Sequence, residues 1–252
     1  MRLYLTKEDY IETDDALDIS IPVNFEKGVT AWYLDKSKSE IVRSDKFVGA
    51  ISEGGAVNFR DIYFNPHAHC THTECCGHIT PDVHSINQQH QSIVCKAALC
   101  TIKPKEILVD ESSDFVITLD HFSNIEDDIK GHEALIIRTS PNSEKKLSKE
   151  YSGTNPVYFD INVLELLNKH EIKHLIIDLP SVDKEQDGGL LSFHHKFWGI
   201  PNNPIMDRTI TELAYISNDI QDGSYLLNLQ IAPFENDASP SRPILYKIRR
   251  AV

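Results

Sequence analysis

The sequence predicts a single β-rich domain of mixed α/β class that spans residues 1–252. Three observations support this. Short runs rich in Ile, Val, Leu, Tyr and Phe recur between turn formers, and they outnumber the helical patterns. One helical pattern lies between two such runs, as in a strand–helix–strand unit. The chain has no internal repeat, low-complexity tract or flexible linker, so its 252 residues are most simply one domain with a substantial core.

Eight segments have the composition and length of β-strands, and each is bounded by turn-forming residues. They are residues 17–23, 57–64, 115–122, 133–139, 174–180, 210–216, 225–233 and 244–250. The segments 133–139 and 174–180 are largely apolar, which is typical of parallel strands buried on both faces.

Three segments have helical patterns. The clearest covers 160–170, DINVLELLNKH, where Asp160 is a plausible N-cap and apolar residues recur at helical spacing. It joins the two apolar strands named above, which predicts a parallel pair with a crossover helix. Further helices are predicted around 86–100 and at 190–198.

Composition and charge exclude several classes of partner. The net charge is −13, and both nucleic acid and anionic membranes favour basic surfaces instead. No apolar run approaches the 18 or so residues of a membrane span. The start, MRLYLTKEDYIETDD, has no apolar segment like that of a signal peptide, so a cytoplasmic protein is expected.

The five cysteines are an odd number in a chain without secretion signals, which favours reduced thiols over disulfides. No C-x-x-C pair occurs, and this argues against a zinc knuckle or a thioredoxin-type site. We expect the cysteines to be small buried residues that line a pocket.

The most unusual stretch is 64–80, FNPHAHCTHTECCGHIT, which holds four histidines, three cysteines and a glutamate. His72 and Glu74 are two residues apart, so on an extended segment they face the same side and can share an ion. Two imidazoles and a carboxylate suit Zn²⁺, Mn²⁺ or Fe²⁺ and leave coordination positions open for water. A thiol-centred site and a solvated histidine-rich loop remain alternatives, because spacing alone does not separate them.

Four further segments resemble, in order, the cyclase family of metal-dependent hydrolases, whose best-known members are the bacterial kynurenine formamidases. CTHTECCGH matches the second half of the family motif His-x-Gly-Thr-His-x-Asp-x-Pro-x-His. The similar strings downstream are ALIIRT (134–139), LIIDLPSVD (175–183), HHKFW (194–198) with ITEL (210–213), and NDASPSRPIL (236–245). The resemblance implies the swivelling β/β/α fold of that family.

The motif departs from the family pattern at several positions. Ala68 stands where the family has its first histidine, so His67 or His69 must replace that ligand, and a one-residue bulge could bring His67 into place. Glu74 replaces the aspartate. The cysteines at 70 and 76 replace the glycine and the proline.

The resemblance implies a site with one or two divalent ions, Zn²⁺ first and Mn²⁺ second. The implied metal ligands are His67, His72, Glu74, His194 and Glu212. His67 is preferred to His69. His194 is preferred to its neighbour His195 because His194 matches the family spacing better.

Other residues are assigned to catalysis and substrate. His78 resembles the catalytic acid/base of the family, and Asp178, Ser181 and Asp183 are candidate substrate contacts at the carboxyl end of a parallel strand. Arg138, at the end of a buried strand, is expected to be a structural ion-pair partner.

The implied function is hydrolysis of a small amide by metal-activated water, with His78 moving the proton to the leaving nitrogen. The specific expectation is an arylformamidase that converts N-formylkynurenine to kynurenine and formate, in a homo-oligomer. The alternatives are the same chemistry on another cyclic amide, lactam or ester, and a metal-poor relative that only binds a small molecule.

Overall fold

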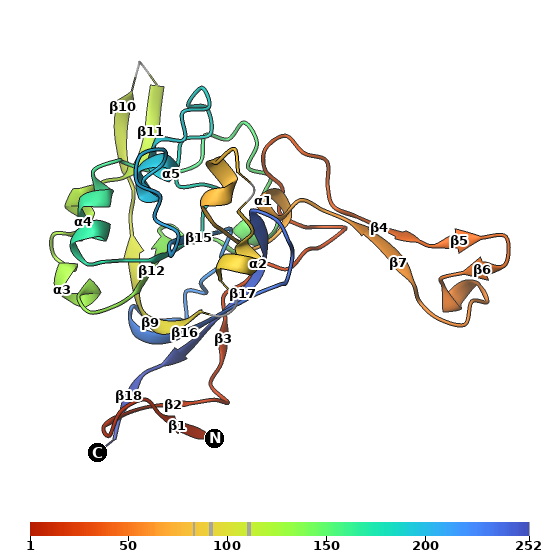
Figure 1. Ribbon diagram of the computed structural model, residues 1–252, viewed down its shortest axis with the longest axis horizontal. Helices are drawn as coiled ribbons and strands as arrows, with labels where there is room; N and C mark the ends of the chain where they lie inside the picture. Colours follow the sequence, from red (N-terminus) through yellow and green to blue (C-terminus); the bar gives the residue numbers. More distant parts are fainter. Residues whose placement is uncertain (83, 91–92, 110–111, 252) are drawn as a thin grey trace.

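The central feature of the fold is a closed β-barrel (Figure 1), seen in a computed structural model that describes residues 1–82, 84–90, 93–109 and 112–251. In spatial order its strands are β16 (Gly223–Ile231), β9 (Ile93–Ile102), β12 (Ala134–Thr139), β14 (His174–Ile177), β15 (Thr209–Glu212), β8 (His72–Glu74) and β17 (Ala238–Lys247). β16 also pairs with β17, which closes the ring, and β3 (Leu17–Asp18) adds to β17.

The predicted parallel pair lies in the middle of this barrel. β12 pairs in parallel with β9 on one side and with β14 on the other, in a register that places Ala134 opposite His174. β14 is in turn parallel to β15, whereas β8, β16 and β17 are antiparallel to their neighbours. The strand–helix–strand prediction is therefore confirmed.

Alternate residues of the barrel strands enter two different cores, as the period of two in a strand requires. Ile136 and Leu99 belong to a cluster drawn from β9, β12, β14, β16 and β17, which fills the barrel interior. Leu135 and Cys100 point the other way, into a larger cluster shared with the covering helices. Both faces of the parallel strands are thus buried, which explains their nearly continuous apolar sequence.

Short helices cover the outside of the barrel and connect its strands. The α-helices are α1 (Pro66–His69), α2 (Ile86–Gln89), α3 (Glu126–Ile129), α4 (Val163–Lys169) and α5 (Ser192–Phe197). Four 3₁₀ turns accompany them: η1 (Ile51–Glu53), η2 (Cys76–Ile79), η3 (Leu119–Phe122) and η4 (Glu144–Ser148). The apolar side chains of α4 and α5 pack into the outer core, which contains Phe193, Phe197 and the fully buried Trp198.

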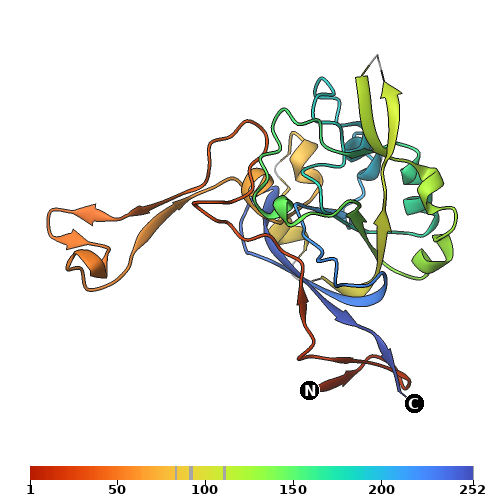
Figure 2. The same cartoon turned by 180° about the vertical axis from the view of Figure 1, so that it is seen from behind.

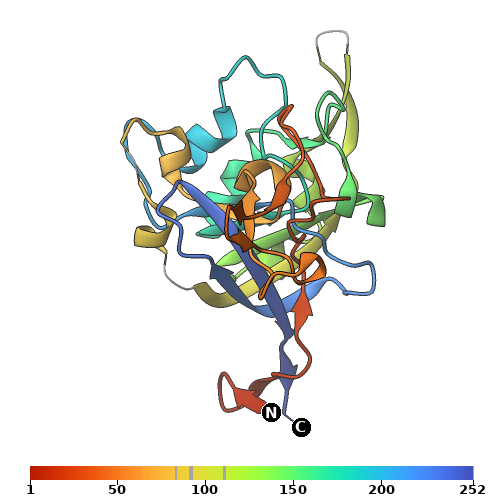
Figure 3. The same ribbon diagram turned by 90° about the vertical axis from the view of Figure 1, so that its right-hand side faces the viewer.

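Smaller sheets project from the barrel (Figure 2). A long arm is made by β4 (Lys38–Ile41) with β7 (Arg60–Tyr63) and by β5 (Arg43–Ser44) with β6 (Phe47–Val48). Another small sheet, near the termini, contains β1 (Arg2–Tyr4), β2 (Asp9–Glu12) and β18 (Arg249–Arg250). A further sheet contains β10 (Lys105–Val109), β11 (Ser112–Ile117) and β13 (Tyr158–Phe159). Figure 3 shows the terminal sheet extending below the barrel. Among the described residues, no helix is long and apolar enough to cross a bilayer.

One predicted helix is wrong. Of the segment 86–100, only Ile86–Gln89 is helical, and Ile93–Ile102 forms the barrel strand β9, while 91–92 lie outside the described residues. Burial along the first part of β9 alternates, from buried Ile93 through exposed Val94 to buried Cys95, and this is strand periodicity. Pairing with two neighbouring strands outweighed the helical propensity of its alanines and lysine.

Several other boundaries moved. The helix predicted at 160–170 begins at Val163, and Asp160 accepts a hydrogen bond from the backbone of Asn162 in the preceding turn instead of serving as the N-cap. The strand predicted at 210–216 ends at Glu212, because Leu213 adopts a left-handed conformation with φ of 53°. The helix at 190–198 is observed as α5.

Candidate metal centre

The centre is built on β8 and β15, which pair in antiparallel register with His72 opposite Glu212. Thr73 and Thr211 from the same strands point into the barrel, where their hydroxyls hydrogen-bond to each other. His72, Glu74 and Glu212 therefore face outward, into the space beneath the covering helices. His72 Nε2 lies 3.5 Å from Glu212 Oε2, so the segments 64–80 and 210–213, which both hold implied ligands, meet here.

His67, and not His69, joins these residues. The short helix α1 begins after Asn65, whose side chain accepts a hydrogen bond from the backbone of His67, and Trp32 Nε1 donates to the His67 carbonyl. His67 Nδ1 lies 3.2 Å from Glu74 Oε2. His69 points away, because its Nδ1 accepts from the Asn65 backbone and its Nε2 lies 2.9 Å from the carbonyl of Asp35.

His194 enters from α5 and is almost fully buried. Its Nε2 lies 3.0 Å from Glu74 Oε1 and 3.8 Å from Glu212 Oε1. Asp183 holds the other side of the ring, with its Oδ2 2.6 Å from His194 Nδ1, and it also accepts the backbone N–H groups of Phe193 and His194. Asp183 is thus occupied in positioning His194, while His195 is the partly exposed neighbour.

His78, from η2, stands at the rim of the cluster. Its ring stacks on that of His67 at a centroid distance of 4.3 Å, and its Nε2 is 4.0 Å from Glu74 Oε2. Both rings contact Asp237, which sequence reasoning missed: Oδ2 of Asp237 lies 2.9 Å from His67 Nε2 and 3.0 Å from His78 Nδ1. The signal available was the string NDASPSRPIL, which holds this aspartate but gives no spacing to the other residues.

The donors suit a divalent metal ion. Among the residues that the structure describes, two groups have ligand atoms within 4.8 Å of one another: His67, Glu74 and His78, and His72, Glu74 and Glu212. Glu74 belongs to both groups. His72 Nε2 and Glu74 Oε2 are buried without a hydrogen-bond partner, which is costly unless a cation engages them. Imidazole and carboxylate ligands are those that Zn²⁺ and Mn²⁺ use.

The electrostatics of the metal-free cluster follow from burial and charge pairing. Burial lowers the pKa of His67 and of His194. The neighbouring carboxylates outweigh it and raise each pKa to about 10: Asp237 and Glu74 beside His67, and Asp183 and Glu74 beside His194. Burial together with the charge on His67 lowers the pKa of His72 to about 3. The cluster without metal therefore keeps positive charge on two imidazoles.

A small pocket opens onto the cluster. It has a volume of about 270 Å³ and is lined by Trp32, Leu34, Asn65, His67, His78, Ser181, Leu191, His194 and Glu212. Trp32 and Leu191 adopt left-handed backbone conformations, with φ of 61° and 42°, and such strain concentrates at binding sites. The lining combines the apolar side chains of Trp32, Leu34 and Leu191 with polar Asn65 and Ser181 and with four residues of the histidine–carboxylate cluster.

The candidate substrate residues separate from one another. Ser181 lines the pocket. Asp178 is buried elsewhere, where it accepts from Lys146 Nζ at 2.6 Å and from the backbone and hydroxyl of Thr139. Arg138 pairs with Asp222 at 2.9 Å, which confirms it as a structural ion-pair partner.

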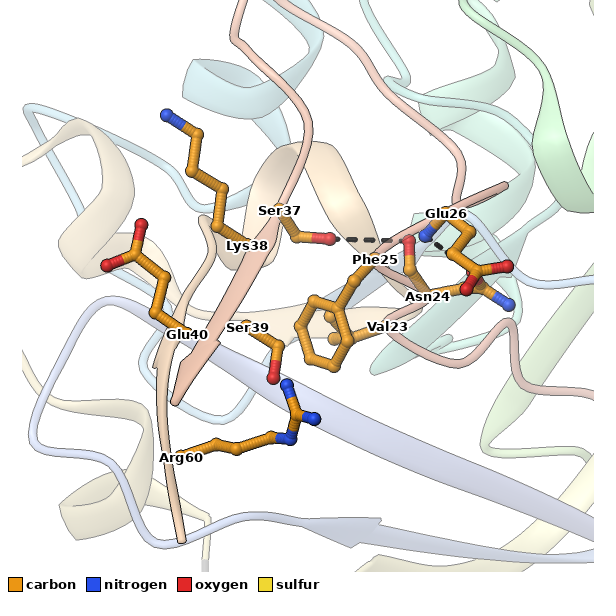
Figure 4. Close-up of a pocket in the computed structure, with 9 residues that line it drawn as sticks. All are labelled: Val23, Asn24, Phe25, Glu26, Ser37, Lys38, Ser39, Glu40 and Arg60. Carbon is orange, nitrogen blue, oxygen red and sulfur yellow. Dashed lines mark hydrogen bonds between the residues drawn. The ribbon is translucent and has the colours of Figure 1, made fainter. Parts of the chain in front are cut away.

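A larger and separate pocket lies at the base of the projecting arm (Figure 4). Its volume is about 860 Å³, and its lining includes Phe25, Ser39 and Arg60, which point toward one another in the figure. None of the cluster residues lines it. The larger pocket is therefore separate from the cluster.

Comparison with known proteins agrees with this fold. The sequence model of the family described as "Putative cyclase" matches residues 17–184. A predicted metal-dependent hydrolase from Bacillus stearothermophilus has a similar structure, with a TM-score of 0.58 and 16% identity over 92% of this chain and 98% of the other. Isatin hydrolase A from Labrenzia aggregata, bound to benzyl benzoate, gives 0.61 and 13% over 92% and 93%.

A further structure, an isatin hydrolase bound to the product analogue thioisatinate, gives a TM-score of 0.66 at 15% identity over 93% of each chain. No curated protein is a significant match. The fold and the site together therefore define the class of the protein: it is a β-rich α/β barrel with an outward-facing histidine–carboxylate cluster. The chain belongs to the cyclase family.

Proposed function

We propose that this protein is a metal-dependent hydrolase of small amides, and that it acts as an arylformamidase on N-formylkynurenine or a close analogue. The observation that supports this best is the buried carboxylate of Glu74, which two sets of possible metal-binding donors share. His67, His78 and Glu212 of these sets also line a small pocket. Structures of low identity described as a metal-dependent hydrolase and as isatin hydrolases are consistent with such chemistry.

Five residues would hold one or two divalent ions: His67, His72, Glu74, His194 and Glu212. A bound ion supplies an activated water and polarises the amide carbonyl. His78 is not needed for ligation in this scheme, and it is the more exposed of the cluster histidines. Its Nε2 accepts the proton of the attacking water and passes it to the departing nitrogen, which yields formate and an aryl amine.

The pocket favours a small, flat substrate. Its volume of about 270 Å³ lies just below the usual range for drug-sized ligands. The indole of Trp32 and the side chains of Leu34 and Leu191 provide apolar walls for an aryl group, while Ser181 and Asn65 offer polar contacts. The second candidate is a cyclic amide such as isatin, because the isatin hydrolases named above have similar structures.

Elemental analysis combined with a substrate panel tests the proposal. The purified protein is loaded with Zn²⁺ or Mn²⁺ and assayed on N-formylkynurenine, other N-formyl arylamines, isatin and simple lactams. We expect bound metal and turnover of the N-formyl aryl amides. Preference for isatin would support the second candidate, and metal-free protein that binds these compounds without turnover would support a binding role.

The ligand set is tested by substitution. Glu74→Gln should remove all bound metal because it alters both donor groups, whereas Glu212→Gln should leave the donors His67 and Glu74 in place. Cys75→Ser is the control, because this thiol is buried and hydrogen-bonds the His84 carbonyl. Loss of metal in the cysteine variant alone would indicate a thiolate site.

The proposal includes a homo-oligomer in the cytoplasm. The projecting arm exposes apolar side chains on a narrow ribbon, which an association partner would cover: Phe47, Ile51, Val57, Phe59, Ile62 and Tyr63. A second copy of the chain is the proposed partner. All five cysteines are unpaired, which suits a reducing compartment.

A further inference from the structure

We infer that Asp237 is a positioning residue that fixes the opposite tautomers of His67 and His78, so that each presents the ring nitrogen its role requires. One carboxylate oxygen, Oδ2, lies within 3.0 Å of a nitrogen on both rings. The inference rests on the proposed function for the roles of the two histidines.

The chemistry follows from what a carboxylate can do. An ionised carboxylate only accepts hydrogen bonds, so each ring nitrogen facing Asp237 must carry a hydrogen. His67 faces it with Nε2, so Nδ1, which lies 3.2 Å from Glu74 Oε2, is the nitrogen that must lose its proton to ligate an ion. His78 faces it with Nδ1, which leaves Nε2 facing the cluster, 4.0 Å from Glu74 Oε2. When neutral, each of the two imidazoles is thereby fixed in the tautomer that its proposed role requires.

This contact explains how the chain can lack a histidine at position 68. Ala68 is completely buried and packs in the core with Ile21 and Leu213, so it cannot reach an ion. His67 comes from the neighbouring position of α1, and its ring must be held for Nδ1 to face the cluster. Asp237 holds it through a carboxylate–histidine pair, the arrangement that commonly orients a metal-ligating imidazole.

The loop that carries Asp237 is itself anchored. The backbone N–H of Cys75 donates to the Asp237 carbonyl, so the loop is tied to the motif between Glu74 and His78. Two residues earlier, Glu235 accepts hydrogen bonds from Asn87 and Gln88. Glu235 therefore provides a matched control, since it is a carboxylate of the same loop that anchors α2 but does not contact the cluster.

The experiment compares Asp237→Ala, Asp237→Asn and Glu235→Gln with the wild type. Zn²⁺ affinity is measured by chelator competition, the tautomers by two-bond ¹⁵N–¹H NMR of the histidine-labelled Zn²⁺ protein, and folding by circular dichroism. We expect Asp237→Ala to weaken Zn²⁺ binding by about 10- to 100-fold, the usual effect of removing such a partner. Asp237→Asn, which keeps the size and one neutral acceptor, should be intermediate, and Glu235→Gln should remain within about twofold of the wild type.

Turnover adds an independent readout. At saturating Zn²⁺, Asp237→Ala should lower kcat further, with KM almost unchanged, because His78 loses its fixed orientation. The inference is overturned if both Asp237 variants keep wild-type affinity and tautomers, or if Glu235→Gln causes an equal loss, which would reduce Asp237 to a loop anchor. If the wild type binds Zn²⁺ but hydrolyses no amide, the proposed function fails while the affinity and tautomer comparison still decides the role of Asp237.

Discussion

At the scale of single residues, the position of His78 separates it from the ligands around it. Its side chain is 29% exposed, whereas that of Glu74 is fully buried. His78→Asn should therefore lower turnover by roughly 10²- to 10⁴-fold, the contribution of a positioned acid/base, while metal content stays at the wild-type value. Steady-state kinetics beside elemental analysis measures both. Loss of metal in this variant would identify His78 as a ligand instead.

The raised pKa values of His67 and His194 predict a proton-linked metal affinity. Each pKa is raised to about 10, so both rings are protonated in the metal-free protein at pH 7, and each must lose that proton to become a ligand. Metal binding should therefore release protons, and affinity should rise with pH from 6 to 8. Calorimetry of Zn²⁺ binding in buffers of different ionisation enthalpy measures the release. A binding enthalpy that does not depend on the buffer would contradict the prediction.

Sequence reasoning found the residues that belong to recognisable motifs and missed the one that does not. His72 and Glu74 are two apart on one strand, and the strand period of two is enough to place them on the same face. Asp237 lies far along the chain from both histidines it contacts, and only the pairing of β17 with β8 brings it close. The choice of His67 over His69 depends on the turn of α1, which the spacing of the motif does not define.

At the scale of elements, α5 depends on Asp183 for its first turn. Asp183 accepts two backbone N–H groups of α5 and contacts the ring of His194, although the residue before the helix, Leu191, provides no side-chain cap. Asp183→Ala should cost about 1–3 kcal/mol of folding stability, as expected when buried donors lose their acceptor, and should also weaken metal binding. Chemical denaturation gives the first quantity and chelator competition the second.

Ser192→Ala is the control for this helix, since Ser192 begins α5 but is exposed. It should leave both measurements within about 0.5 kcal/mol of the wild type, as is usual for surface changes. A loss of stability in Asp183→Ala without any change in metal affinity would show that Asp183 supports the helix but does not position His194.

Element prediction succeeded where local pattern and tertiary pairing agree. The apolar strands 133–139 and 174–180 are buried on both faces, and their sequence indicated this directly. The segment 86–100 was misassigned because its alanines and glutamines favour a helix, whereas β9 lies between β12 and β16 and gains hydrogen bonds on both edges. That gain comes from strands distant in sequence, so no local pattern reports it.

At the scale of the whole molecule, the sequence predicted which segments meet but not how the barrel closes. The implied metal ligands are about 120 positions apart in the sequence and must share one site. In the structure, His194 Nε2 does lie 3.0 Å from Glu74 Oε1. Closure depends on β17 pairing with both β8 and β16, and it places the cluster on the outer face. The register of those pairs follows from packing across the barrel, which a single sequence does not encode locally.

The last prediction concerns the arm formed by β4–β7, which leaves the barrel as a narrow ribbon in Figures 1 and 2. Near its tip Phe47 and Phe59 contact edge-to-face at 6.0 Å, yet Phe59 remains 56% exposed. A ribbon of this kind has no core to cover its apolar side chains, so a second copy of the chain is expected to do so. Light scattering after gel filtration should give a dimer or a larger assembly for the wild type. Phe59→Ser should shift the mass toward the monomer, while Phe115→Ser on the separate β10–β11 hairpin should leave it unchanged; a monomeric wild type would contradict the prediction.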